Sequence, residues 1–218
     1  MKKVTAILAL AGSVAIVGSA QAFVPWTNTN GTATNFDWFG GGSDNGYFGS
    51  PILVGGDTFV FFPSTFRAQS VNGGADIRAD RLQVELLAHL GQRFDSISIT
   101  EFGDYGVGGA GSSVTADMAM FITDLNNFRV ANTNQQYNNS TPGLGNWSLG
   151  ATIDLTLSPP AWNHVQLVLN NNLIAISGGP GGFAFIEKKV QGIIIRIPTP
   201  GSMAMLGMGG LALIRRRR

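Results

Sequence analysis

The stretch that decides the fold is Trp147-Ser148-Leu149-Gly150-Ala151-Thr152-Ile153-Asp154-Leu155-Thr156-Leu157, in which apolar and polar residues alternate. A period of two is the spacing of a β-strand that buries one face and leaves the other in solvent. The same alternation recurs in residues 96–101, 114–122 and 165–169. The sequence therefore predicts an all-β fold.

Turn residues separate these apolar runs, as they do between the short strands of an all-β domain. Residues 57–62 and 183–197 add an early and a late strand, and Asn170-Asn171-Asn172 predicts a hairpin turn because asparagine tolerates the left-handed conformation. Residues 82–90 fit a strand or a helix, and the glycine turn and strand that follow favour a strand. We expect about eight to ten strands in a jelly-roll-like antiparallel β-sandwich over residues 23–197.

The composition excludes several kinds of chemistry. The chain has 218 residues, of which 12% are charged, 30 are glycine and none is cysteine. Without cysteine it forms no disulfide and no thiolate metal site, and its two histidines cannot make a three-histidine metal centre. The length fits one domain with short segments at its ends.

The first 22 residues have the layout of a secretory signal peptide. Lys2 and Lys3 precede an apolar stretch over residues 4–17, and Ala20 and Ala22 supply the small residues of a cleavage site. A retained membrane anchor is the alternative, but the apolar run is short for a membrane span. We therefore expect the export machinery and signal peptidase to leave a mature chain that begins at Phe23.

Residues 198–218 form a second segment with the layout of a targeting signal. Pro198, Thr199 and Pro200 precede a charge-free stretch, and the chain ends in Arg215, Arg216, Arg217 and Arg218. As a helix, the fourteen residues 201–214 would rise only about 21 Å, which is short of the roughly 30 Å hydrocarbon core of a bilayer. The prolines before them and the snorkelling arginines after them would help the segment to span the membrane as a single helix. Because arginines stay on the cytoplasmic side, the body would lie outside.

This order of proline motif, apolar helix and arginine cluster resembles the PEP-CTERM sorting signal. Pro198, Thr199 and Pro200 correspond to its proline motif and residues 203–214 to its helix, although Thr199 stands where the motif has glutamate. The resemblance implies an exported bacterial protein that an exosortase processes, often in organisms that make biofilm or exopolysaccharide. An ordinary C-terminal tail anchor is the alternative.

The body between these segments is acidic. Lys2, Lys3 and the four terminal arginines are six of the 14 basic residues, so the body keeps 8 basic against 13 acidic residues, a net charge of −5. A chain with this charge has no global basic patch, so we expect no nucleic acid among its partners.

Acidic residues in glycine- and asparagine-rich stretches make calcium a candidate cofactor. Calcium takes carboxylate and carbonyl oxygens from loops, and the candidate ligands are Asp44, Asp76, Asp80 and Asp104. The stretches lack the regular ligand spacing of a calcium loop, and Asp and Asn also favour turns through local hydrogen bonds. Both interpretations stay open.

Aromatic residues make sugar binding a candidate function. Trp38 lies among phenylalanines and glycines, and Trp162 follows Pro159-Pro160 at the end of a loop. Either indole could stack on the apolar face of a sugar while nearby Asn and Asp bind its hydroxyls. The alternative is that these aromatics belong to the core.

Catalytic motifs are missing from the sequence. Glu85, Glu101, Asp104 and Asp117 could pair as the carboxylates of a glycosidase, but no short motif brings them together. His89 and His164 are isolated, and the sequence has neither a nucleophile elbow nor a phosphate loop. We therefore expect no enzyme and predict no catalytic residue.

Three hypotheses for the function follow. The first is an exported surface or extracellular-matrix protein without catalytic activity, anchored by its C-terminus or released by a sortase. The second is a carbohydrate-binding module for the exopolysaccharide of the cell that makes it. The third is a glycoside hydrolase. Exposed aromatics would favour the second, and paired carboxylates are required by the third.

Overall fold

The computed structural model describes residues 23–198, and every regular element in this range is a strand. The strands are β1 (Val24–Pro25), β2 (Gly31–Thr32), β3 (Phe36–Ser43), β4 (Ile52–Val54), β5 (Thr58–Phe61), β6 (Arg67–Val71), β7 (Gly74–Ala88), β8 (Ser96–Gly108), β9 (Ser113–Asp124), β10 (Val130–Asn139), β11 (Gly143–Asp154), β12 (His164–Ser177) and β13 (Phe183–Arg196). Within residues 23–198 there is no helix with the length and apolar character of a membrane span.

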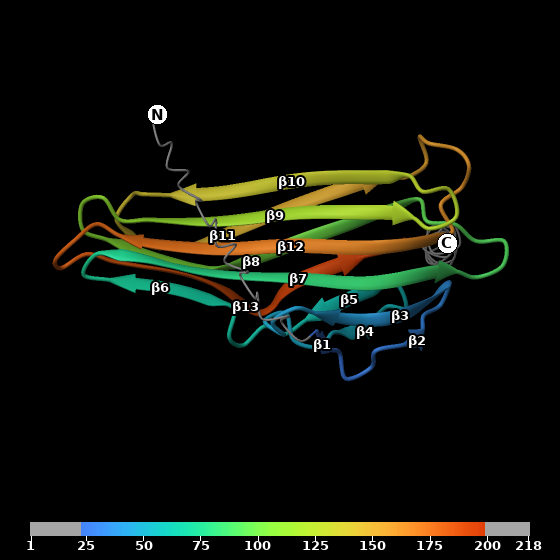
Figure 1. The fold of residues 1–218 in the computed structure, drawn as a ribbon, viewed down its shortest axis with the longest axis horizontal. Helices are drawn as coiled ribbons and strands as arrows, with labels where there is room; N and C mark the ends of the chain where they lie inside the picture. Colours follow the sequence, from blue (N-terminus) through green and yellow to red (C-terminus); the bar gives the residue numbers. More distant parts are fainter. Residues whose placement is uncertain (1–22, 199–218) are drawn as a thin grey trace, which may run out of the picture.

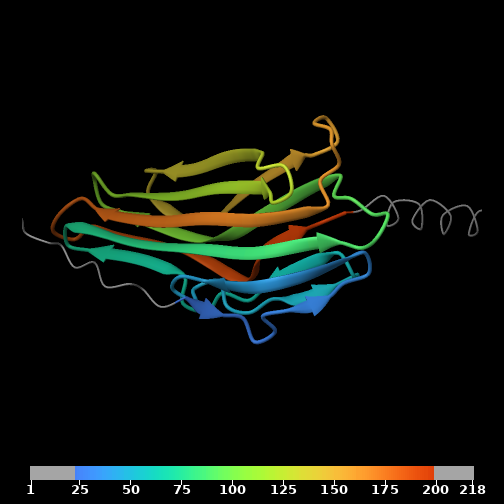
Figure 2. The same ribbon diagram turned by 45° about the vertical axis from the view of Figure 1, so that its right-hand side comes forward.

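The strands form two antiparallel sheets. The larger sheet has seven strands in the order β1-β3-β7-β12-β9-β10, with β2 paired to β3. The smaller sheet has six strands in the order β11-β8-β13-β5-β4, with β6 paired to β13. Figure 1 shows the long strands of the larger sheet lying side by side, and Figure 2 shows the same layers after a turn of 45°. The prediction of an antiparallel all-β sandwich is confirmed.

Alternation along each strand sends apolar side chains into the space between the sheets. On β9 the side chains of Val114, Ala116, Met118, Met120 and Ile122 are all buried, as the period of two predicts. On β7, Leu82, Val84 and Leu86 are buried in the same way, so the strand prediction for this segment is confirmed against the helix. Leu90, the last residue of that predicted face, lies beyond the end of β7 and is exposed.

Aromatic rings fill one part of the core. Phe36, Phe48, Phe59, Phe61, Phe66 and Phe94 are fully buried. The ring of Phe59 meets that of Phe36 edge to face at 6.1 Å and that of Trp38 at 5.4 Å. In such pairs the positive edge of one ring attracts the negative face of the other, which stabilises the core in addition to the burial of apolar area.

The predicted hairpin turn at Asn170-Asn171-Asn172 is wrong. β12 runs without a break from His164 to Ser177 and pairs with β7 on one side and β9 on the other. Ladder hydrogen bonds on both edges outweigh the turn preference of asparagine. The structure has thirteen strands within residues 23–198, more than the eight to ten predicted, because the two-residue strands and the polar β10 carry no apolar alternation.

The two predicted targeting segments fall outside the described residues. Ala20 and Ala22 of the cleavage site lie before residue 23, and Thr199, Pro200 and Arg215 to Arg218 lie after residue 198. Pro198 is the last described residue and follows β13 directly, so the sandwich leads into the tail through its final strand.

Candidate functional site

Trp38 is buried in the core, so the prediction that it stacks on a sugar is wrong. Its ring packs edge to face on Phe59, and its Nε1–H donates to the carbonyl of Asn28 at 3.2 Å. Gly31 lies directly against the ring, and a side chain there would collide with the indole. With its ring packed against Phe59 and Gly31, Trp38 offers no free platform.

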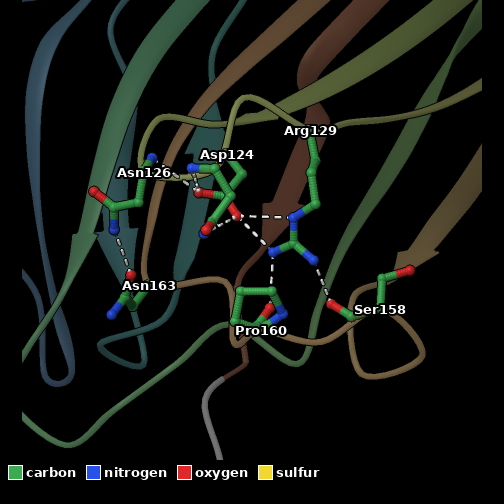
Figure 3. Close-up of polar contacts among 7 residues, drawn as sticks. Asp124, Asn126, Arg129, Ser158, Pro160 and Asn163 are labelled. Carbon is green, nitrogen blue, oxygen red and sulfur yellow. Dashed lines mark hydrogen bonds and ion pairs between the residues drawn. The ribbon is translucent and has the colours of Figure 1, made fainter.

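Trp162 is also buried, and the prediction of sugar stacking fails there for a different reason. The guanidinium of Arg129 lies 4.4 Å from the centre of the indole ring and covers it. The same guanidinium donates to the carbonyls of Ser158 at 2.6 Å and Pro160 at 2.7 Å (Figure 3). The loop before β12 therefore folds around Arg129 rather than presenting Trp162 to solvent.

Asp124 holds Arg129 in this position. This fully buried carboxylate accepts hydrogen bonds from the side chain of Arg129, the side chain of Asn127 and the backbone N–H groups of Asn126 and Asn127 (Figure 3). Burial raises the pKa of Asp124, but these hydrogen bonds outweigh it, so the pKa lies below its usual value. The cluster fastens the β9–β10 turn to the loop before β12 and has a structural role.

The four candidate calcium ligands do not form a site. Asp80 is buried and accepts hydrogen bonds from Ser43 Oγ at 2.9 Å and from the backbone N–H groups of Asn45 at 2.8 Å and Tyr47 at 2.7 Å. Protein donors thus occupy both of its oxygens, which fixes the chain after β3 onto β7.

Asp44 lies near Asp80, whereas Asp76 and Asp104 lie elsewhere. Asp44 is 3.9 Å from Arg81, Asp76 accepts from the backbone of Gln69 at 3.0 Å, and Asp104 pairs with Lys189 at 2.8 Å on the smaller sheet. Residues 23–198 contain no cluster of three or more acidic or histidine side chains that could hold a metal ion. The calcium prediction is therefore corrected: protein groups engage these carboxylates one by one.

The carboxylates considered for glycoside hydrolysis are also apart. Glu85 on β7 contacts His164 Nε2 at 2.6 Å, and Glu101 on β8 is buried between the sheets. Asp117 lies on the same outer face as Glu85, but the register places it six residues along the sheet, about 20 Å away at strand spacing. Glycosidase pairs need roughly 5–10 Å, so Glu85 and Asp117 are too far apart to form one.

The outer face of the larger sheet is rich in amide side chains. On the edge strand β10 they are Asn132, Asn134, Gln136 and Asn138, and on the central strand β12 they are Gln166, Asn170 and Asn172. We call these seven residues the amide face. Register confirms that they share one side, because Asn134 lies opposite Ala119, and Ala119 lies opposite Asn170.

Small residues between the amides hollow this face. One shallow hollow of about 460 Å³ is lined by Asp44, Asn45, Ala79, Arg81, Asn170 and Asn172, among others. A second, of about 370 Å³, is lined by Asp117, Ala119, Asn134 and Gln136 and shares Asn170 and Asn172 with the first. The two hollows therefore meet at β12 and together cross the strands from β7 to β10.

Sequence reasoning missed this face. The segment over β10, Val-Ala-Asn-Thr-Asn-Gln-Gln-Tyr-Asn-Asn, has polar residues on both of its faces and no hydrophobic alternation. The asparagine run that includes Asn170 and Asn172 predicts a turn instead. The signal present in the sequence is an amide side chain at every second position, at 132, 134, 136 and 138. This period of two marks one face of a strand, although amide rather than apolar side chains carry it.

Comparisons with known proteins give little further information. No family model and no curated protein matches the chain. Among solved structures, TmCBM61 in complex with β-1,4-galactotriose is similar over 79% of this chain and 97% of that one, with 10% identity and a TM-score of 0.24. At this TM-score the likeness carries no argument about the site or the function.

Proposed function

We propose that this chain is an exported surface protein without catalytic activity, and that its sandwich binds extracellular polysaccharide across the amide face. The observation that supports binding is the pair of adjoining hollows on β7, β12, β9 and β10. A polysaccharide strand could lie across the β-strands and contact both hollows at Asn170 and Asn172.

The chemistry of this face suits sugar hydroxyls. Each Asn or Gln amide offers two donors and an acceptor, which match vicinal hydroxyls that both donate and accept. Asp117 accepts a hydrogen bond from Gln136 at 2.6 Å, which orients that amide at the rim of the second hollow. The floor residues Ala79 and Ala119 leave room for a ring to approach the sheet.

Export and display are supported by the two ends of the sequence. A signal peptide over residues 1–22 and a PEP-CTERM-like tail over residues 198–218 would leave a jelly-roll-like body outside the membrane. Processing by an exosortase-type enzyme would release the body to the cell surface or the matrix. The net charge of −5 on the body favours uncharged or cation-bridged polysaccharides.

The experiment is retention of the body, residues 23–197, on the extracellular polysaccharide of the producing organism, with calcium and with a chelator. We expect retention in both conditions, because the calcium candidates are engaged by protein groups. The double change Asn170→Ala and Asn172→Ala should weaken retention about tenfold or more, at roughly a kcal/mol per lost hydrogen bond.

A matched control is Asn146→Ala. Asn146 is an exposed amide on β11, on the outer side of the smaller sheet. Retention that falls equally in the control, or that survives the double change in a folded protein, would contradict binding at the amide face.

A further inference from the structure

Three polar side chains meet in the core between the two sheets. Lys188 comes from β13, Glu101 from β8 and Asn171 from β12, and they are 5%, 0% and 1% exposed. Lysine and glutamate are rarely buried to this extent unless paired. Their side chains lie between the two sheets, whereas the amide face is on the outer side of the larger sheet.

One carboxylate brings the other two groups together. Lys188 Nζ donates to Glu101 Oε2 at 2.6 Å, and Asn171 Nδ2 donates to Glu101 Oε1 at 2.8 Å. Asn171 Oδ1 is buried and has no hydrogen-bond partner among residues 23–198. The amine of a lysine and the carboxamide of an asparagine are therefore held side by side by a group that can take and give protons.

The surroundings are dry and aromatic. The Lys188 Nζ atom lies 5.0 Å from the centre of the Trp147 ring and 5.3 Å from that of Phe66, and both rings are buried. Burial lowers the pKa of Lys188, although the charge of Glu101 acts in the opposite direction. Desolvation in an apolar pocket is the usual way in which a protein makes a lysine amine nucleophilic.

A purely structural role explains the arrangement poorly. Burying an ion pair costs desolvation that its attraction barely offsets, and apolar residues of similar size often stabilise a core at least as well. An unpartnered amide oxygen adds a further cost. Each member nevertheless has the chemical type and the place that a condensation of amine with amide requires.

We propose that Lys188 and Asn171 condense into an intramolecular isopeptide bond, with Glu101 as the catalytic residue. The ammonium of Lys188 passes a proton to Glu101 and becomes a neutral amine. After a half-turn of the Asn171 amide, the protonated Glu101 donates to Oδ1 and polarises the carbonyl. The lone pair of Nζ then attacks Cγ of Asn171.

The step balances without any co-reactant. The Nζ–Cγ bond forms and the Cγ–Nδ2 bond breaks, while one amine proton moves through Glu101 to Nδ2. Ammonia leaves, and Glu101 remains as a carboxylic acid bonded to the new amide. The product links β12 of the larger sheet to β13 of the smaller sheet across the core.

Mass spectrometry of the purified protein tests it. Chymotrypsin cuts after Leu173 and Phe185, so Asn171 and Lys188 fall in separate peptides unless they are joined. We expect a branched peptide that contains both residues and is lighter than the sum of its parts by about 17 Da, the mass of ammonia. Trypsin should fail to cut after Lys188.

Variants separate the chemistry from the fold. Glu101→Gln and Lys188→Arg should abolish the branched peptide, and Asn171→Asp should change the lost mass to about 18 Da, the mass of water. Lys189→Arg, next to Lys188 but exposed and paired with Asp104, should leave the branched peptide intact. Separate, unmodified Asn171 and Lys188 peptides from the folded natural chain would overturn the proposal, whatever the variants do.

Discussion

Among single residues, Asp124 and Arg129 keep the indole ring of Trp162 away from solvent. The carboxylate holds the guanidinium, the guanidinium covers the indole, and the loop before β12 closes over both through Ser158 and Pro160. A tryptophan beside two prolines suggested an exposed ring, but no sequence pattern connects it with an arginine that lies on another turn. Burial of Trp162 is thus a tertiary effect.

Changing Asp124 to Asn should loosen this loop. The variant keeps the shape of the side chain but leaves Arg129 without its charged partner. We expect the free energy of unfolding to fall by about 2 kcal/mol, a value already lowered because Arg129 is partly exposed. Urea unfolding followed by tryptophan fluorescence measures the loss. Asp154→Asn is the control, because Asp154 is exposed and its hydrogen bonds within residues 23–198 go to the nearby Thr156. A loss as large in the control would refute the role given to Asp124.

The same carboxylate predicts a dependence on pH. The pKa of Asp124 is lower in the folded chain than the value of about 3.9 in an unfolded chain, so the unfolded state binds more protons as the pH falls. Its contribution to stability is therefore complete above about pH 4 and is lost as the pH falls through the folded pKa. Unfolding curves from pH 7 to pH 3 should show a steeper decline for the natural chain than for Asp124→Asn, and parallel curves would contradict this.

Among the elements, β8 of the smaller sheet runs between β11 and β13 and needs a residue without a side chain at Gly103, which lies opposite Trp147 and Lys188. A Cβ at this position would collide with the carbonyl of Glu187 on β13 and with Nε1 of Trp147. On the neighbouring strand β11, a Cβ at the exposed Gly150 would meet only ordinary contacts, at 3.6 Å to the carbonyl of Ile99.

The two glycines therefore make a matched pair of predictions. Gly103→Ala should lower the free energy of unfolding by about 2 kcal/mol or more, because the backbone carbonyl of Glu187 cannot easily move away from the new Cβ. Gly150→Ala should be neutral or stabilising by roughly 0.5 kcal/mol, since alanine costs less entropy than glycine in a strand. Chemical unfolding of both variants measures the difference, and equal effects would show that the packing around Gly103 is misassigned.

Elements also show where sequence reasoning works. On β9, β8 and β11, one buried face against one solvated face gives a period of two, and the sequence predicts a strand in each place. The bounds differ, because β8 continues beyond residue 101 to Gly108 and β11 ends at Asp154 rather than at Leu157. On β10 and in the middle of β12 the polar residues on the outer face hide the strand. Asn171 is a buried polar residue whose partner Glu101 lies 70 positions away, so only the tertiary structure reveals its role.

Processing at both ends would change the length and the charge of the whole molecule. The expected mature chain begins at Phe23 and lacks Arg215 to Arg218, because the signal peptide and the PEP-CTERM-like tail would be removed. Terminal peptides of the protein recovered from the producing cells measure this directly. A mature protein that keeps the arginines would favour an ordinary tail anchor over sortase processing.

The isopeptide bond would also act on the whole molecule. β13 is the strand that leads into the C-terminal tail, and Lys188 lies near its middle. A covalent link from Lys188 to Asn171 would pass a pull on the tail directly to the central strand of the larger sheet, whose far side carries the amide face. Anchoring and binding would then be joined by one covalent path.

Binding of polysaccharide at the amide face can be tested by comparing the affinities of three proteins. The dissociation constant for an oligosaccharide cut from the polysaccharide of the producing organism should be determined for the natural body, the Asn170→Ala and Asn172→Ala double variant, and Asn146→Ala. We predict about tenfold weaker binding in the double variant and no change in Asn146→Ala. Equal affinities for all three folded proteins, or no binding by the natural body, would contradict the claim.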